Sequence, residues 1–122
     1  FDPTSHGEIE AIRDACRRLR RVELTGAELY TSCEPCALCV AAMHIVGIRR
    51  LFYAASLDQS GTAFDGLPDA ARHPIDVHRL RAEAGAPIDA RQLPAEQHRA
   101  GEALDILRAW AAPRRQHTEP TP

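Results

Sequence analysis

The chain has 122 residues, a formal net charge of −2 and 44% hydrophobic residues. This length suits one domain with one core, and the composition is ordinary for a soluble globular protein. A pI of about 6.3 argues against a dedicated nucleic-acid binder, which needs a strongly basic surface. No apolar run approaches the ~20 residues that cross a bilayer, and no signal-peptide pattern is present, so we expect no membrane association.

The first predicted element is a helix over residues 5–20, because apolar residues recur there at helical spacing. Ser5 and Glu8, three positions apart, have the pattern of a capping box at its start. A short strand is predicted over residues 28–32, which include Tyr and Thr.

The next predicted helix has Pro35 in its first turn and ends at Gly47. A buried strand is predicted over residues 48–54, which are largely apolar. The resulting order of helix, strand, helix and strand predicts a parallel strand pair joined by a crossover helix.

The second half of the chain gives weaker patterns. Residues 56–74 are rich in Gly, Asp, Pro and Ala and are predicted to form a long loop. A short helix is expected over 78–84, a third strand over 87–93 and an amphipathic helix over 95–111. Residues 113–122 contain three prolines without periodicity and are predicted to be a loose tail.

Three of the four cysteines, Cys33, Cys36 and Cys39, lie close together in the sequence. This spacing suits metal binding or catalysis in a reducing compartment better than a disulfide framework. We therefore expect a cytoplasmic protein.

Two short motifs carry the candidate chemistry, H-x-E at residues 6–8 and P-C-x-x-C at residues 35–39. A catalytic zinc takes three nitrogen or thiolate ligands and keeps its fourth position for water. Two cysteines separated by two residues at a helix start can direct both sulfurs to one point. We predict that Zn²⁺ is bound by His6, Cys36 and Cys39.

Glu8 is predicted to be the catalytic acid and base. Zinc lowers the pKa of a bound water to about 7, and a nearby carboxylate can take its proton and pass it to departing ammonia. Alternatively, Glu8 is only the capping partner of Ser5 at the start of the helix. The alternative for the metal is a closed structural site in which Cys33 is the fourth ligand.

The H-x-E and P-C-x-x-C pair is the signature of zinc deaminases, and residues 2–54 resemble the cytidine deaminase-like superfamily. Within it, the segment TSCEPCALC is most similar to bacterial guanine deaminases and other small base or nucleoside deaminases. The resemblance implies a three-layer α/β/α sandwich with a mixed five-stranded sheet. It also implies a homodimer and a deaminase domain over residues 1–112, without counterparts of the family's first helix and first two strands. The composition of residues 113–122 predicts a disordered tail after this domain.

The segment Ala63-Phe64-Asp65 resembles the Gly-Phe-Asp segment of guanine deaminases, which implies that Asp65 contacts the amidine edge of the base. Phe64 would then stack on the ring. The alternatives are a simple turn at Asp65-Gly66 and a core position for Phe64. Gly7 stands where guanine deaminases usually have Ala, which leaves more room near the metal.

The substrate that the resemblance implies is a free nucleobase or small nucleoside. Guanine is the leading candidate, followed by cytosine or isocytosine. A tRNA adenosine substrate comes third, because the charge balance disfavours nucleic acid. The alternative to an enzyme is a catalytically inactive zinc-binding module.

Two further ionisable side chains are Glu34 and His73. Glu34, directly before the P-C pair, is either a helper of the metal site or a surface cap, and the sequence leaves both open. His73 shows no ligand spacing to any other histidine, so no role at the metal is expected for it.

Overall fold

The computed structural model describes residues 1–115 and divides the chain into two compact units, Phe1–Ala86 and Pro87–Pro122. The domain predicted over residues 1–112 spans both units. Of the predicted tail, residues 116–122 lie outside the described residues. Among the helices described, none is both long and apolar enough to cross a bilayer.

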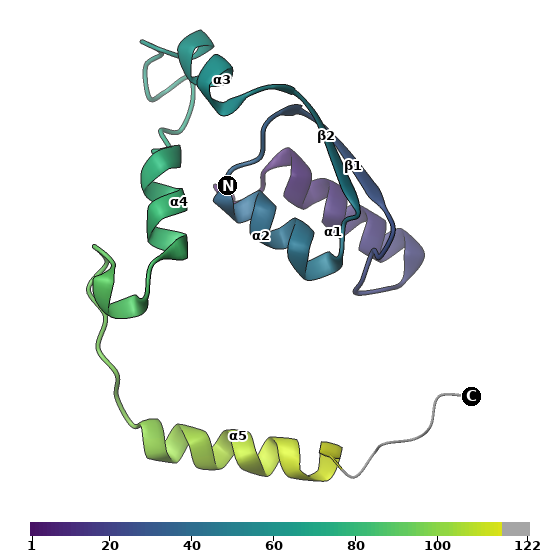
Figure 1. Ribbon diagram of the computed structural model, residues 1–122, viewed down its shortest axis with the longest axis vertical. Coiled ribbons are helices and arrows are strands. Elements are labelled where there is room, and N and C mark those ends of the chain that lie inside the picture. The colour runs from purple at the N-terminus through teal and green to yellow at the C-terminus, as the bar shows by residue number, and fades with distance from the viewer. Residues whose placement is uncertain (116–122) are drawn as a thin grey trace. The chain divides into compact units, whose positions relative to one another are not determined.

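The first unit contains both predicted motifs. Its elements are α1 (Gly7–Leu19), β1 (Glu28–Cys33), α2 (Ala37–Val46), β2 (Arg50–Ala55), α3 (Leu57–Ala63) and α4 (Val77–Gly85). Strands β1 and β2 pair in parallel, with Leu29 opposite Leu51, and α2 is the connection between them. Figure 1 shows α1 and α2 beside each other against this pair of strands. The predicted parallel pair with a crossover helix is confirmed.

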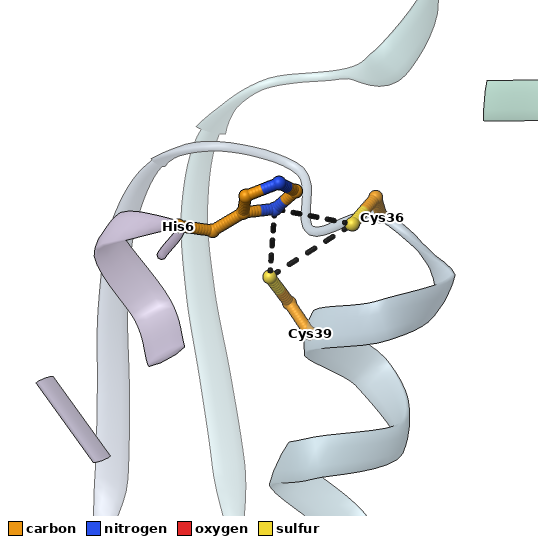
Figure 2. Close-up of side chains that lie close together, drawn as sticks. All are labelled: His6, Cys36 and Cys39. Atoms are coloured by element: carbon orange, nitrogen blue, oxygen red, sulfur yellow. Dashed lines mark hydrogen bonds between the residues drawn. The ribbon is translucent and has the colours of Figure 1, made fainter. Parts of the chain in front are cut away.

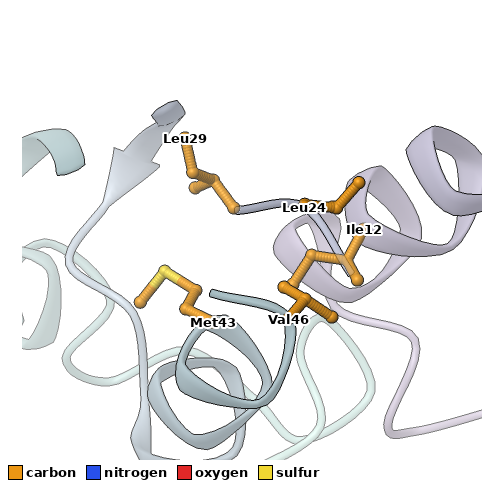
Figure 3. Packing of buried hydrophobic residues seen from close by; sticks show 5 residues of the cluster. All are labelled: Ile12, Leu24, Leu29, Met43 and Val46. Atoms are coloured by element: carbon orange, nitrogen blue, oxygen red, sulfur yellow. The ribbon is translucent and has the colours of Figure 1, made fainter. Parts of the chain in front are cut away.

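A small hydrophobic core joins the helices to the strands (Figure 3). Its buried members are Ile12, Leu24, Leu29, Met43 and Val46. Burying a side chain of this size stabilises the fold by about 1.5–3 kcal/mol. As predicted, α2 ends at Gly47, whose φ of 82° lies in the left-handed region that favours glycine.

The two strands are not buried on both faces, so the prediction of a buried second strand was wrong. Leu29 of β1 is buried in the core, whereas Tyr30 stacks on Phe52 of β2 with ring centroids 4.7 Å apart. Both rings are exposed, because successive side chains of a strand point to opposite faces. The described sheet has two strands, against five implied by the family resemblance, while the α/β class agrees.

The segment after β2 is not the continuous loop that its composition predicted. Ser56 caps helix α3 by accepting a hydrogen bond from the Gln59 backbone N–H, and the Gln59 side chain accepts one from the Ser56 N–H. This reciprocal pair is a capping box, and it begins a helix of 7 residues. The short helix predicted over 78–84 is confirmed as α4.

In the second unit, the strand predicted over residues 87–93 was wrong. Residues Ile88–Ala90 form a 3₁₀ turn, closed by a hydrogen bond from the Ala90 N–H to the Pro87 carbonyl. A strand needs a neighbouring strand for its backbone hydrogen bonds, and a local turn satisfies them without one. The last helix, α5 (Ala100–Arg115), begins and ends later than predicted, so the tail's first three residues are helical.

Candidate metal and catalytic site

The three predicted zinc ligands lie at the beginnings of two helices. His6 and Cys36 are the N-cap residues of α1 and α2, and neither side chain makes a capping hydrogen bond. Both are therefore free to point into the space between the helices. Cys39 lies in the first turn of α2 and is fully buried, at 0% exposure. Pro35 precedes the N-cap, so its predicted place in the first turn was wrong.

The ligand atoms of these residues converge on one point (Figure 2). His6 Nδ1 lies 3.4 Å from Cys36 Sγ and 3.4 Å from Cys39 Sγ, and the two sulfurs are 3.9 Å apart. Zinc bonds of about 2.3 Å to sulfur and 2.0–2.1 Å to nitrogen, at tetrahedral angles, would separate two sulfurs by about 3.8 Å and sulfur from nitrogen by about 3.6 Å. The observed spacing therefore fits one tetrahedral zinc ion.

Cys33 is not a member of this cluster. Among the described residues, the converging ligand atoms belong to His6, Cys36 and Cys39 alone. Three protein ligands leave one corner of the tetrahedron open, which is the arrangement of a catalytic rather than a structural zinc site. The alternative of a closed site with Cys33 is thus not favoured by the geometry.

The chemistry of Cys39 also calls for a cation. Burial raises the pKa of the Cys39 thiol, and the neighbouring Cys36 sulfur and Glu8 carboxylate raise it further. Two thiolates beside a carboxylate are costly to bury unless positive charge is brought between them. A bound Zn²⁺ supplies that charge, with additional help from the positive end of α2.

Glu8 faces the cluster and does not form the predicted capping box with Ser5. Helix α1 begins after His6, while the Ser5 hydroxyl donates to Glu10 at 2.5 Å. The Glu8 Oε1 atom accepts a hydrogen bond of 2.6 Å from the Thr31 hydroxyl, and Oε2 accepts one of 3.4 Å from the Cys39 thiol. Capping is therefore not the role of this side chain.

The surroundings of the Glu8 carboxyl favour its ionised form. Burial acts to raise its pKa, but the hydrogen bonds from Thr31, from its own backbone N–H and from Cys39, together with the charge of His6, lower the pKa below its ordinary value. A carboxylate that is already ionised can accept a proton at neutral pH.

A cavity of about 420 Å³ opens beside the cluster. His6, Glu8 and Cys36 line one part of it together with their sequence neighbours, and residues of α3, of the following loop and of α4 line the opposite part. These further wall residues include Leu57, Ser60, Phe64, Arg72, Ile75 and Val77. The cavity is large enough for a small planar ligand beside the converging ligand atoms.

The structure brings only one of the two predicted substrate residues to this cavity. Phe64 lines it, whereas Asp65 is exposed and lines neighbouring hollows. The guanidinium of Arg72 lies 4.3 Å from the centre of the Phe64 ring, and His73 also lines the cavity. Sequence reasoning missed Arg72 and gave His73 no role, because no local spacing links them to the ligands.

Comparison with known proteins shows which families share these features. Residues 1–55 match the family described as the cytidine and deoxycytidylate deaminase zinc-binding region. The chain is 36% identical over 109 residues to the guanine deaminase of Bacillus subtilis, covering 89% of this chain and 64% of that enzyme. It is 39% identical over 87 residues to a tRNA-specific adenosine deaminase of Agrobacterium fabrum, covering 68% and 57% of the two chains.

One solved structure has a similar fold. The X-ray structure of guanine deaminase from Bacillus subtilis superposes with a TM-score of 0.71 at 35% sequence identity. The match covers 91% of this chain and 64% of that one. The chain thus spans less than two thirds of the length of these relatives.

Proposed function

We propose that the chain is a zinc-dependent hydrolase of nucleobases or small nucleosides, because residues 1–55 match the cytidine and deoxycytidylate deaminase zinc-binding region. In this reaction water attacks the ring carbon that bears an amino group, ammonia leaves, and a carbonyl remains. The observation that carries the proposal is the position of Glu8. Its Oε2 atom lies 3.4 Å from Cys39 Sγ, within the ligand cluster and beside the cavity.

The zinc ion that His6, Cys36 and Cys39 would hold supplies an activated water, since it lowers the pKa of that water to about 7. The proton is handled by Glu8. Thr31 holds Oε1, so Oε2 is the atom that accepts the proton. In the thiolate form that a metal would require, Cys39 would not donate to Oε2, and that oxygen would be able to accept the proton. Glu8 then delivers the proton to the amino group as it leaves.

The cavity wall opposite the ligands suits a flat ring. Phe64 offers an aromatic face, and Leu57 and Val77 add apolar surface. Guanine is the substrate we favour, supported by the likeness to a guanine deaminase over 89% of the chain. The tRNA-specific relative covers less of the chain, and the net charge of −2 does not favour binding to RNA.

The test is ammonia release by the zinc-loaded protein with Glu8→Gln as the critical variant. We expect a loss of about 10²–10⁴-fold in kcat, because glutamine keeps the shape but cannot carry the proton. Glu10→Gln is the matched control, since Glu10 lies on the same helix turn but is exposed and pairs with Arg13. If wild type and Glu8→Gln hold zinc and are equally inactive on every base, the chain is a zinc-binding module.

A substrate panel of guanine, cytosine, isocytosine, adenosine and a tRNA anticodon stem-loop separates the remaining candidates. Guanine should give the highest kcat/KM. Asp65→Ala tests the role that the family resemblance implies for Asp65. A selective loss of guanine turnover would support that role, whereas unchanged turnover would agree with the position of Asp65 outside the cavity. Preference for the stem-loop, with binding that weakens steeply as salt rises, would replace guanine by tRNA adenosine.

A further inference from the structure

Glu34 connects three parts of the first unit that lie far apart in the sequence. Its Oε1 atom accepts a hydrogen bond of 3.2 Å from the backbone N–H of Leu57, the first residue of α3. Its Oε2 atom lies 3.5 Å from a guanidinium nitrogen of Arg81 on α4. Its own backbone N–H donates to the carbonyl of Ala55 at 2.7 Å. One side chain thus contacts both helices that follow the sheet.

Those two helices form the cavity wall opposite the ligand cluster. Leu57, Ser60 and Gly61 of α3 and Val77 of α4 line the cavity, as does Glu34 itself. Glu34 also precedes, by one buried proline, the ligand Cys36. The contacts of the Glu34 carboxylate with Leu57 and Arg81 therefore help to set the distance between the ligand cluster and the wall.

We infer that Glu34 is a positioning residue, which fixes α3 and α4 against the loop that carries Cys36 and so sets the width of the cavity. The Leu57 N–H is one of the first amides of a helix and has no acceptor within that helix, so the carboxylate satisfies it and complements the positive helix end. The Arg81 pair adds less, since Arg81 is 60% exposed and water screens the attraction. The effect on base binding rests on the proposed function.

The chain offers a closely matched control. Glu28 pairs with Arg49 at 2.7 Å, and the side-chain exposures, 31% for the glutamate and 60% for the arginine, equal those of Glu34 and Arg81. Glu28 lies at the start of β1 and does not line the cavity. If the loss of an ion pair of this exposure were enough to loosen the wall, Glu28→Ala would have the same effect on α3 and α4 as Glu34→Ala.

Amide hydrogen exchange on the zinc-loaded full chain tests the inference without any substrate. For Glu34→Ala we expect exchange in α3 to become about 10-fold faster, because a charge-assisted hydrogen bond to Leu57 is lost. Glu34→Gln keeps an acceptor and should restore most of the protection in α3 but not in α4. Zinc content should stay at one ion per chain, and Glu28→Ala should leave exchange in α3 and α4 unchanged.

Steady-state kinetics supply the second readout. A wall that contacts the base equally before and during the reaction affects binding but not the chemical step, so Glu34→Ala should raise KM about 10-fold while kcat changes little. Unchanged exchange in α3, an equal effect of Glu28→Ala, or loss of zinc from Glu34→Ala would each overturn the inference. If Glu34→Ala does not fold, Glu34→Gln and Arg81→Ala decide, and Arg81→Ala must loosen α4 alone. A wild type inactive on every base would defeat the proposed function and leave the exchange result standing.

Discussion

Helices α1 and α5 have similar sequence patterns but very different surroundings. In α1, the apolar stripe is buried at Ile9 and Ile12, which face the rest of the first unit. In α5, Leu104, Leu107 and Trp110 recur at the same spacing, yet none is buried, and neither is any other residue from 87 to 115. Helical periodicity therefore predicts that a helix forms, while burial depends on a partner surface that the local pattern does not encode.

The metal ligands belong entirely to the well-packed region. Helices α1 and α2 pack on each other around Ile12, Met43 and Val46, and this packing fixes the helix starts that carry His6 and Cys36. A catalytic site needs its ligands held to within a fraction of an ångström, which only a close-packed scaffold provides. The difference in packing between the two helices is thus also a difference in how well each region can hold a ligand set in place.

Removal of zinc should have the largest effect on stability. A metal that binds only the folded state stabilises it by about 4 kcal/mol when free metal is 1,000 times its Kd. We expect chelation to lower the unfolding temperature of the wild type, as followed by circular dichroism. Cys33→Ser should respond to chelation as the wild type does, whereas Cys39→Ser should be insensitive. Zinc retained by Cys39→Ser and lost from Cys33→Ser would overturn the ligand set.

The second largest effect on the free energy of unfolding is expected from truncation of a core side chain, compared with a matched truncation in α5. Met43→Ala removes a core side chain that is only 7% exposed, and we expect a cost of about 3 kcal/mol from lost contacts and a cavity. Leu107→Ala, at a site 61% exposed, should cost less than about 0.5 kcal/mol. Urea denaturation of both variants measures the difference. Equal costs would show that α5 is as tightly packed as α2.

The smallest effect is expected at Gly7. A methyl group added there would meet no atom within 4 Å, and its backbone is not in the left-handed region. Gly7→Ala should therefore stabilise α1 by about 0.5 kcal/mol, because alanine has less freedom to lose on folding. The same denaturation assay tests this, with zinc binding unchanged. Weaker zinc binding in Gly7→Ala would show that the extra space beside the metal matters.

The sequence predicted the features that arise from neighbouring residues. Helix periodicity and Gly47 located α1 and α2, because the relevant spacings lie within a few turns of one helix. The two motifs named the three residues whose ligand atoms converge, although His6 lies 30 positions before Cys36, and it is the family signature that links them. Helix α3 was missed although the signal was present, since Ser56 and Gln59 have the spacing of a capping box. The abundance of Gly, Asp, Pro and Ala in residues 56–74 favoured a loop and outweighed the capping pattern.

Other features depend on distant contacts and had no local signal. The strand expected over 87–93 needed a pairing partner, and a turn formed instead. Phe64 and Arg72 meet through the path of the loop between them, which no periodicity describes. The two contacts of Glu34 likewise depend on where α3 and α4 come to lie.

Both parallel strands end beside the cavity, since Cys33 ends β1 and lines it, and Leu57, two residues after β2, lines it as well. The three residues with converging ligand atoms, and Glu8 beside them, all precede Ala55, where the family match also ends, and most of the opposite wall follows it. Under the proposed function, the residues for the chemistry and those for selectivity would therefore occupy consecutive stretches of the chain. Exchange of residues 56–77 would then alter which molecule is admitted and leave the converging ligand set unchanged.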